Sequence, residues 1–108
     1  MAGPRYLVDT SVMARAGIEA VGERLESLAL EGRLWTCRLV DLELVYAARA
    51  RDVWNVQSQR LAFPEAPITP AVMDRALQVA ALMAARGAHR GAKPIDFVIA
   101  AAAEARKL

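Results

Sequence analysis

Near its N-terminus the chain reads Tyr6-Leu7-Val8-Asp9-Thr10-Ser11, and this segment is the most informative about fold class. The first three residues form a short apolar run that is typical of a buried strand. Asp, Thr and Ser follow at once, and these residue types commonly cap the N-terminus of a helix. We therefore expect a strand over residues 6–8 that passes directly into a helix.

The rest of the chain continues this alternation. A short helix is expected up to Ala16, and apolar residues at helical spacing predict a second one over residues 19–30, with Gly32 as its C-cap. Residues 34–36 predict a second strand. Further elements are expected as follows: helices over residues 41–51, 54–63, 70–86 and 94–108, and an edge strand between prolines at residues 66–68. Strands that alternate with helices predict an α/β fold with a parallel sheet.

Local signals support two of these helices in particular. Thr69 and Pro70 are suited to be the N-cap and first residue of the long helix, which Gly87 would end. In the helix expected over residues 41–51, one side carries a set of residues at helical spacing, namely Leu42, Val45, Tyr46 and Arg49.

Length and composition exclude several classes of protein. The 108 residues suffice for one domain, and 56% hydrophobic with 24% charged residues exclude a disordered tail. The net charge of +2 does not by itself indicate nucleic-acid binding, although the basic residues are mostly Arg, which suits phosphate or carboxylate. A single cysteine, Cys37, excludes disulfide and multi-cysteine zinc frameworks. With neither a secretory signal pattern nor a membrane-length apolar stretch, the sequence predicts a soluble cytoplasmic protein.

Three acidic residues stand out on separate expected elements. Asp9 ends the first strand, where open α/β sheets bind ligands, but it could equally cap the next helix. Glu43 lies in an apolar segment, with Asp41 competing for its role two residues away. Asp96 follows Pro94 in a first helical turn, where the helix dipole alone favours a negative charge. If these acids converge, their oxygens suit a hard ion such as Mg²⁺ or Mn²⁺.

Other chemistries fit the sequence less well. The haloacid-dehalogenase pattern needs a second Asp two residues after the first, where this chain has Ser11. A P-loop and a G-x-G-x-x-G fingerprint are absent from the sequence. Serine hydrolase chemistry lacks its nucleophile elbow and would depend on the single histidine, His89, which we expect to serve a loop or an interface instead.

Three segments resemble the motifs of the PIN domain family. These are residues 6–12, residues 40–49 around Glu43, and residues 88–101, in which Asp96 opens a helix with an Ile-Ala-Ala run. Their order and spacing are similar to those of small VapC-type toxins, the ribonucleases of bacterial toxin–antitoxin pairs. The resemblance covers nearly the whole chain. It implies a PIN-like three-layer α/β fold, in which helices flank a small central parallel sheet.

The resemblance also implies an activity, a divalent-metal-dependent endoribonuclease that uses Mg²⁺ or Mn²⁺. Asp9, Glu43 and Asp96 correspond to the family's metal-binding, catalytic acids. Ser11 corresponds to the hydroxyl that supports the first Asp, and Thr10 is its neighbour in the same motif.

Further expectations concern partners. Arg90 and Lys93 lie near the third acid and are candidates for contacts to the RNA backbone, or else solvated loop charges. The resemblance implies an RNA substrate, a VapB-like antitoxin that occupies the same groove, and a homodimer formed through the helices after Arg49. No membrane association is expected.

The chain end is the one departure from the family pattern. PIN domains continue into another strand and a fourth acidic position, whereas this chain stops at Leu108. We therefore expect a single PIN-like domain over residues 1–108 that is incomplete at its C-terminus and leaves the first strand with an unpaired edge. Two alternatives remain open: a catalytically incompetent PIN module that binds antitoxin or dimerises, and a PIN nuclease of RNA processing without an antitoxin.

Overall fold

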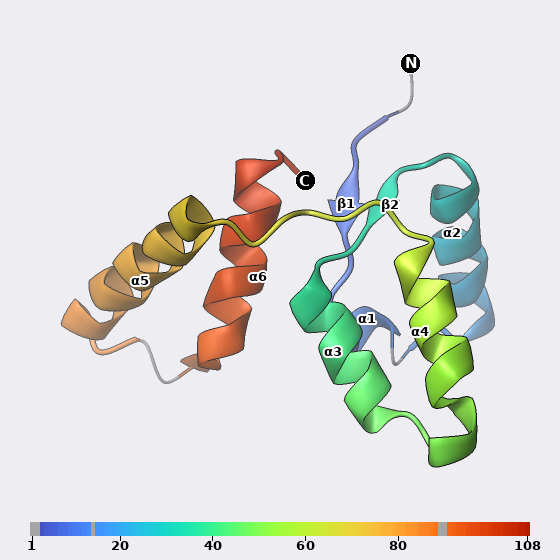
Figure 1. Ribbon diagram of the computed structural model, residues 1–108. Coiled ribbons are helices and arrows are strands. Elements are labelled where there is room, and N and C mark those ends of the chain that lie inside the picture. Colours follow the sequence, from blue (N-terminus) through green and yellow to red (C-terminus); the bar gives the residue numbers. More distant parts are fainter. Residues whose placement is uncertain (1–2, 14, 89–90) are drawn as a thin grey trace.

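The computed structural model describes residues 3–13, 15–88 and 91–108, and Figure 1 shows its elements. In chain order these are β1 (Tyr6–Leu7), α1 (Thr10–Met13), α2 (Glu19–Leu30), β2 (Leu34–Trp35), α3 (Arg38–Ala47), the 3₁₀ turn η1 (Ala50–Asp52), α4 (Val53–Leu61), α5 (Pro70–Ala85) and α6 (Pro94–Ala105). The strands β1 and β2 pair in parallel, with Tyr6 opposite Leu34. The predicted α/β class with a small parallel sheet is confirmed.

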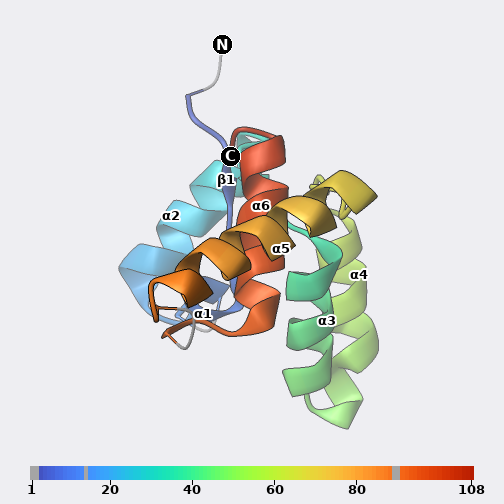
Figure 2. The same cartoon turned by 90° about the vertical axis from the view of Figure 1, so that its left-hand side faces the viewer.

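Helices cover both faces of the two strands. In Figures 1 and 2, α2 and α4 lie on one side of β1 and β2, and α5 and α6 lie on the other. Two hydrophobic clusters match these layers. One joins Val8 and Leu34 to Leu28 of α2. The other joins α3, α5 and α6 through residues such as Val40, Ala76 and Ala102.

The ends of α2 and α5 lie where the sequence predicts them. Thr69 caps α5, because its side-chain oxygen accepts a hydrogen bond from the Val72 N–H at 3.2 Å. Gly32 and Gly87 have φ of +70° and +68°, a backbone conformation that other residues adopt at a cost. Each glycine follows the C-cap of its helix, and the N–H groups just beyond the helix bond back to the last turn.

The prediction of a helix over residues 41–51 is wrong at both ends and in its apolar side. This helix begins at Arg38, three residues earlier than expected, and ends at Ala47. Leu42 is 61% exposed and Tyr46 is 85% exposed, whereas Val40 is fully buried. The segment carries apolar residues all round, so that its spacing could not show which side packs in the core.

The expected strand over residues 66–68 is also absent from the described structure. Instead, Thr36 and Glu65 form an isolated parallel bridge, with the Ala66 N–H donating to the Thr36 carbonyl at 2.7 Å. The next bonds of such a ladder would form at residue 38, but there the chain has already entered α3, so the pairing ends.

Two further observations concern the edge of the sheet and the length of the helices. Within the described ranges β1 pairs only with β2, so its other edge has no strand partner there. None of the helices seen in these ranges is both long and apolar enough to cross a membrane.

Candidate active site

Asp9 lies between β1 and α1, at the carboxyl end of the strand. Its Oδ1 accepts hydrogen bonds from the Ser11 hydroxyl at 2.8 Å and from the Val12 N–H at 3.1 Å. The side chain therefore caps α1 and, at the same time, stays exposed at the end of the sheet. Capping and a role in a site are compatible here, because both bonds use the same oxygen.

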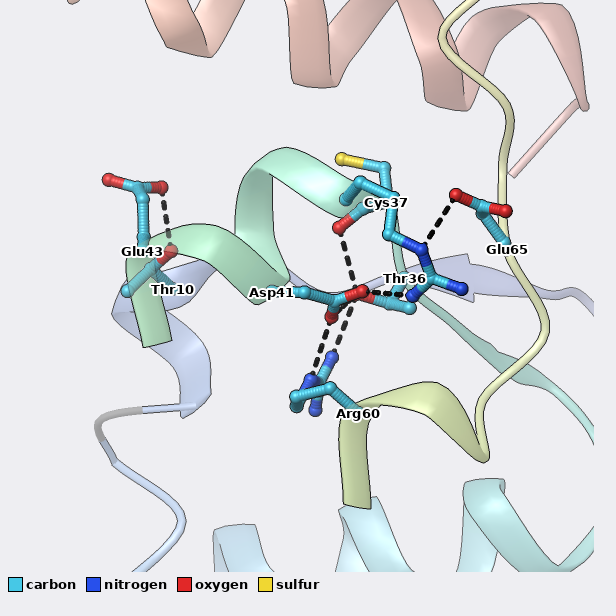
Figure 3. Close-up of polar contacts among 8 residues, drawn as sticks. Thr10, Thr36, Cys37, Asp41, Glu43, Arg60 and Glu65 are labelled. Carbon is cyan, nitrogen blue, oxygen red and sulfur yellow. Dashed lines mark hydrogen bonds and ion pairs between the residues drawn. The ribbon is translucent and has the colours of Figure 1, made fainter. Parts of the chain in front are cut away.

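Glu43 lies on α3 and is half-buried. Its Oε1 accepts a hydrogen bond from the Thr10 hydroxyl at 2.8 Å, as Figure 3 shows. This bond joins α3 to the start of α1, although the two residues are 33 positions apart in the chain.

Asp96 lies in the first turn of α6. Its Oδ2 accepts a hydrogen bond from the Lys93 backbone N–H at 3.0 Å, which closes the N-terminus of the helix. The sequence analysis explained an acid at this position by the helix dipole alone, and the structure adds this capping bond; the side chain is exposed.

The three acids line one cavity of about 640 Å³. Thr10, Ser11 and Lys93 complete its polar lining, and its apolar wall comes from β1 and α6 with Leu7, Ile99, Ala100 and Ala103. Residues from three parts of the chain thus line the same cavity. Arg90 and His89, which the sequence analysis also considered, lie outside the described residues.

The ligand chemistry of this cavity fits a hard divalent cation. Each carboxylate uses one oxygen for the bonds above, and no hydrogen bond within the described chain reaches Asp9 Oδ2, Glu43 Oε2 or Asp96 Oδ1. Carboxylate oxygens of this kind are the ligands that Mg²⁺ and Mn²⁺ prefer. Among residues 3–13, 15–88 and 91–108, no three acidic, His or Cys side chains are already gathered closely enough to form a metal-binding group.

Comparison with known proteins identifies the family. The model of the PIN domain family matches residues 6–108. The chain belongs to the PIN domain family. The resemblance seen in the sequence is therefore confirmed.

Curated relatives of this PIN domain come from Mycobacterium tuberculosis. It is 36% identical to Ribonuclease VapC21 of strain H37Rv over 104 residues, which cover 93% of this chain and 74% of the relative. Ribonuclease VapC51 of the same strain is 40% identical, and the match covers 93% of this chain and 73% of the relative. Ribonuclease VapC2 of strain CDC 1551 is 32% identical, with coverage of 96% and 76%.

Asp41 does not line the acidic cavity of this PIN domain. It is 7% exposed, and its Oδ1 accepts bonds from the Thr36 hydroxyl at 2.8 Å and from Arg60 Nε at 2.9 Å. Arg38 bonds to the other oxygen of Asp41, and its Nε lies 3.0 Å from a carboxylate oxygen of Glu65. Asp41 and Glu43, the two candidates for one role in the sequence, thus have different partners, and of the two only Glu43 lines the acidic cavity.

The sequence analysis missed Arg60, which is 4% exposed at the end of α4. Its guanidinium lies 4.6 Å from the ring centre of Phe63 and bonds to both Asp41 and Thr36. A signal was present, because Arg60 follows Val53 and Val56 at the spacing of an apolar helix side. A cation at such a position requires a buried partner.

A second, mainly apolar cavity of about 820 Å³ lies between α2, α3 and α4. It is lined by residues such as Met13, Leu44 and Phe63. Thr10 belongs to the lining of both cavities. The one-turn helix α1 therefore borders the acidic cavity and the apolar one.

Proposed function

We propose that this PIN domain is the endoribonuclease toxin of a VapBC-type toxin–antitoxin pair, with Asp9, Glu43 and Asp96 holding a Mg²⁺ or Mn²⁺ ion. The observation that carries the proposal is that three acids from β1–α1, α3 and α6 line one cavity. The family match and the ribonuclease names of its relatives support the reaction class. A non-catalytic module would not require acids from three elements to line one cavity.

The side chains at the cavity have separate tasks in this mechanism. When bound, a divalent cation supplies an activated water and positive charge beside the scissile phosphate. Asp9, Glu43 and Asp96 hold the cation with the oxygens that their hydrogen bonds leave available. The Ser11 hydroxyl and the Val12 and Lys93 N–H groups keep two of these carboxylates in place. The Lys93 ammonium at the cavity attracts the RNA phosphate backbone.

The partners of this function follow from the same assignment. The substrate is RNA in the cytoplasm, and a VapB-like antitoxin binds the groove that contains the acids. A homodimer forms through the helices after Arg49, where α4 exposes Trp54. The contribution of Arg90 to RNA binding remains a prediction from the sequence.

An RNA cleavage assay tests the proposal. We expect the chain to cut single-stranded RNA in Mn²⁺ or Mg²⁺ and to lose this activity in a chelator. Asp96→Asn should lower the rate more than about a hundredfold, because a catalytic metal supplies several kcal/mol of transition-state stabilisation. The control is Asp74→Asn, an exposed acid of α5 outside the cavity, which should leave the rate unchanged. Cleavage that persists in a chelator, or an active Asp96→Asn variant, would overturn the proposal.

A further inference from the structure

The three acids of the cavity differ in how their side chains are held. Asp9 and Asp96 accept hydrogen bonds only from residues two or three positions away in their own turns. Such local bonds form whenever α1 and α6 form. Glu43 lies within α3, and in the described chain its carboxylate accepts a bond from one donor, the Thr10 hydroxyl.

This difference matters because Glu43 has the longer and more flexible side chain. Its three rotatable bonds allow many orientations that a shorter Asp does not have. The 2.8 Å between Thr10 Oγ1 and Glu43 Oε1 is an ordinary length for an O–H···O hydrogen bond, and its carboxylate acceptor makes such a bond stronger than one between neutral groups. The bond selects one orientation and leaves Oε2 available.

Thr10 is also well placed for this task. It directly follows Asp9, so that one turn presents the first acid and carries the hydroxyl that binds the second. The rotation of α3 is fixed separately on its other side, where Asp41 bonds to Thr36 and Arg60. Removing the Thr10 hydroxyl should therefore change the orientation of Glu43 and leave the position of its helix unchanged.

We infer that Thr10 is a positioning residue, which holds Glu43 in the orientation that binds the divalent cation. Its role is distinct from that of Ser11, whose hydroxyl donates to Asp9. The inference rests on the proposed metal site and adds to it the residue that orients the ligand of α3.

The test measures the binding of Mn²⁺ to the protein by isothermal titration calorimetry, without RNA. Thr10→Val, which keeps the shape and removes the hydroxyl, should bind Mn²⁺ about tenfold more weakly, the lower end of the range for lost support of a metal ligand. Thr10→Ser keeps the hydroxyl and should bind like the wild type. In a Glu43→Gln background, Thr10→Val should cause no further loss, because the two residues then act as one unit.

A matched control separates positioning from stability. Thr69→Val removes a threonine hydroxyl that caps α5 and does not line the acidic cavity. It should lower the melting temperature and leave Mn²⁺ affinity unchanged. Thr10→Val should leave the melting temperature unchanged and lower the Mn²⁺ affinity. Thr10→Ala provides a second hydroxyl-free variant if Val disturbs the fold.

Three results would overturn the inference: wild-type affinity in Thr10→Val and Thr10→Ala, equally weak binding in Thr10→Ser, or a further loss in the Glu43→Gln background. RNA cleavage by the same samples separates the two proposals. If the wild type binds Mn²⁺ and cuts RNA while the Thr10 variants match it, only the role of Thr10 is wrong. If the wild type neither binds Mn²⁺ nor cuts RNA, the metal site and the role of Thr10 both fail.

Discussion

Asp41 and Glu43 have the same charge and lie two residues apart, yet the structure gives them different surroundings. Two helical steps amount to a rotation of about 200°, so the side chains leave α3 in nearly opposite directions. Asp41 meets Thr36 and Arg60 in the interior, and Glu43 meets Thr10 beside the acidic cavity. One carboxylate stabilises the fold, and the other is available for chemistry.

This difference predicts opposite effects of neutralising the two acids. Asp41→Asn should keep most of the RNA cleavage but lower the free energy of unfolding by about 3 kcal/mol, because it breaks a buried ion pair. Glu43→Gln should lose cleavage and keep its stability. Cleavage rates and urea unfolding of both variants check this. An inactive Asp41→Asn protein beside an active Glu43→Gln protein would reverse the assignment.

A further prediction concerns the reactivity of Cys37. The side chain is fully buried between β2 and α3, and this burial raises the pKa of the thiol. Because the thiolate is the reactive form, the native protein should react with a thiol reagent at pH 8 no faster than it unfolds. The measurement is labelling in buffer and in urea. Rapid labelling in buffer would show that Cys37 is accessible in the native protein and would contradict the prediction.

The sequence located Asp9 and Asp96 in the fold better than it predicted the partners of the acids. Asp9 and Asp96 stand at a strand end and a helix start, and such places are marked by local residue types. The ion pair of Asp41 with Arg60 joins residues 19 positions apart, and no local pattern specifies which acid an arginine will meet. The bond from Thr10 to Glu43 spans an even longer separation.

At the level of elements, the difference between local signals and long-range contacts explains which helices were predicted well. The limits of α2 and α5 depend on Gly32, Gly87 and the Thr69–Pro70 pair, which act within a few residues. At the start of α3, by contrast, Cys37 provides no side-chain cap. Its first turn is held instead by Asp41 and its distant partners, which a local reading of the sequence does not detect.

The network around Arg60 predicts a large loss of stability when it is broken. Arg60→Met leaves the buried Asp41 carboxylate with fewer partners and should lower the free energy of unfolding by about 3 kcal/mol. Arg51→Met is the control, since Arg51 and its partner Asp52 are both substantially exposed, and it should change stability by less than about 0.5 kcal/mol. Urea unfolding measures both. Equal stability of the two variants would show that the buried pair adds nothing to the fold.

For the whole molecule, the acids come together only when the layers of the fold assemble. Asp9 belongs to the sheet layer, whereas Glu43 and Asp96 belong to helices packed around it. A cation that binds all three therefore binds the folded state and not the unfolded one, and it should stabilise the protein.

Thermal melts in a chelator and in millimolar Mn²⁺ test this coupling. Mn²⁺ should raise the melting temperature of the wild type and have much less effect on Asp96→Asn. In the chelator, Asp96→Asn should be the more stable protein by about 1 kcal/mol, since it removes one of three like charges at the cavity. Loss of the favourable interaction with the helix dipole would offset part of this gain. Equal shifts in both proteins would exclude Asp96 from the site.

The proposed homodimer is also a property of the whole molecule. Trp54 is 76% exposed on α4, and Leu61, two turns further along the same helix, is exposed too; β1 has a free edge within the described residues. Trp54→Glu should convert the dimer to a monomer in analytical ultracentrifugation. Leu82→Glu, a matched change at an exposed position of α5, should remain dimeric. A monomeric wild type would contradict the proposal.

The two acids of α3 also restrict how the length of this chain can vary. The bonds of Asp41 and Glu43 fix both sides of the helix, and Thr36 fixes the point where it leaves the strand. One residue inserted or deleted between Thr36 and Glu43 would turn at least one acid by about 100° and separate it from its partner. Insertions and deletions should therefore be tolerated in the connection between α3 and α4, and excluded from residues 36–43. An alignment gap in these eight residues would mark a chain with a different site.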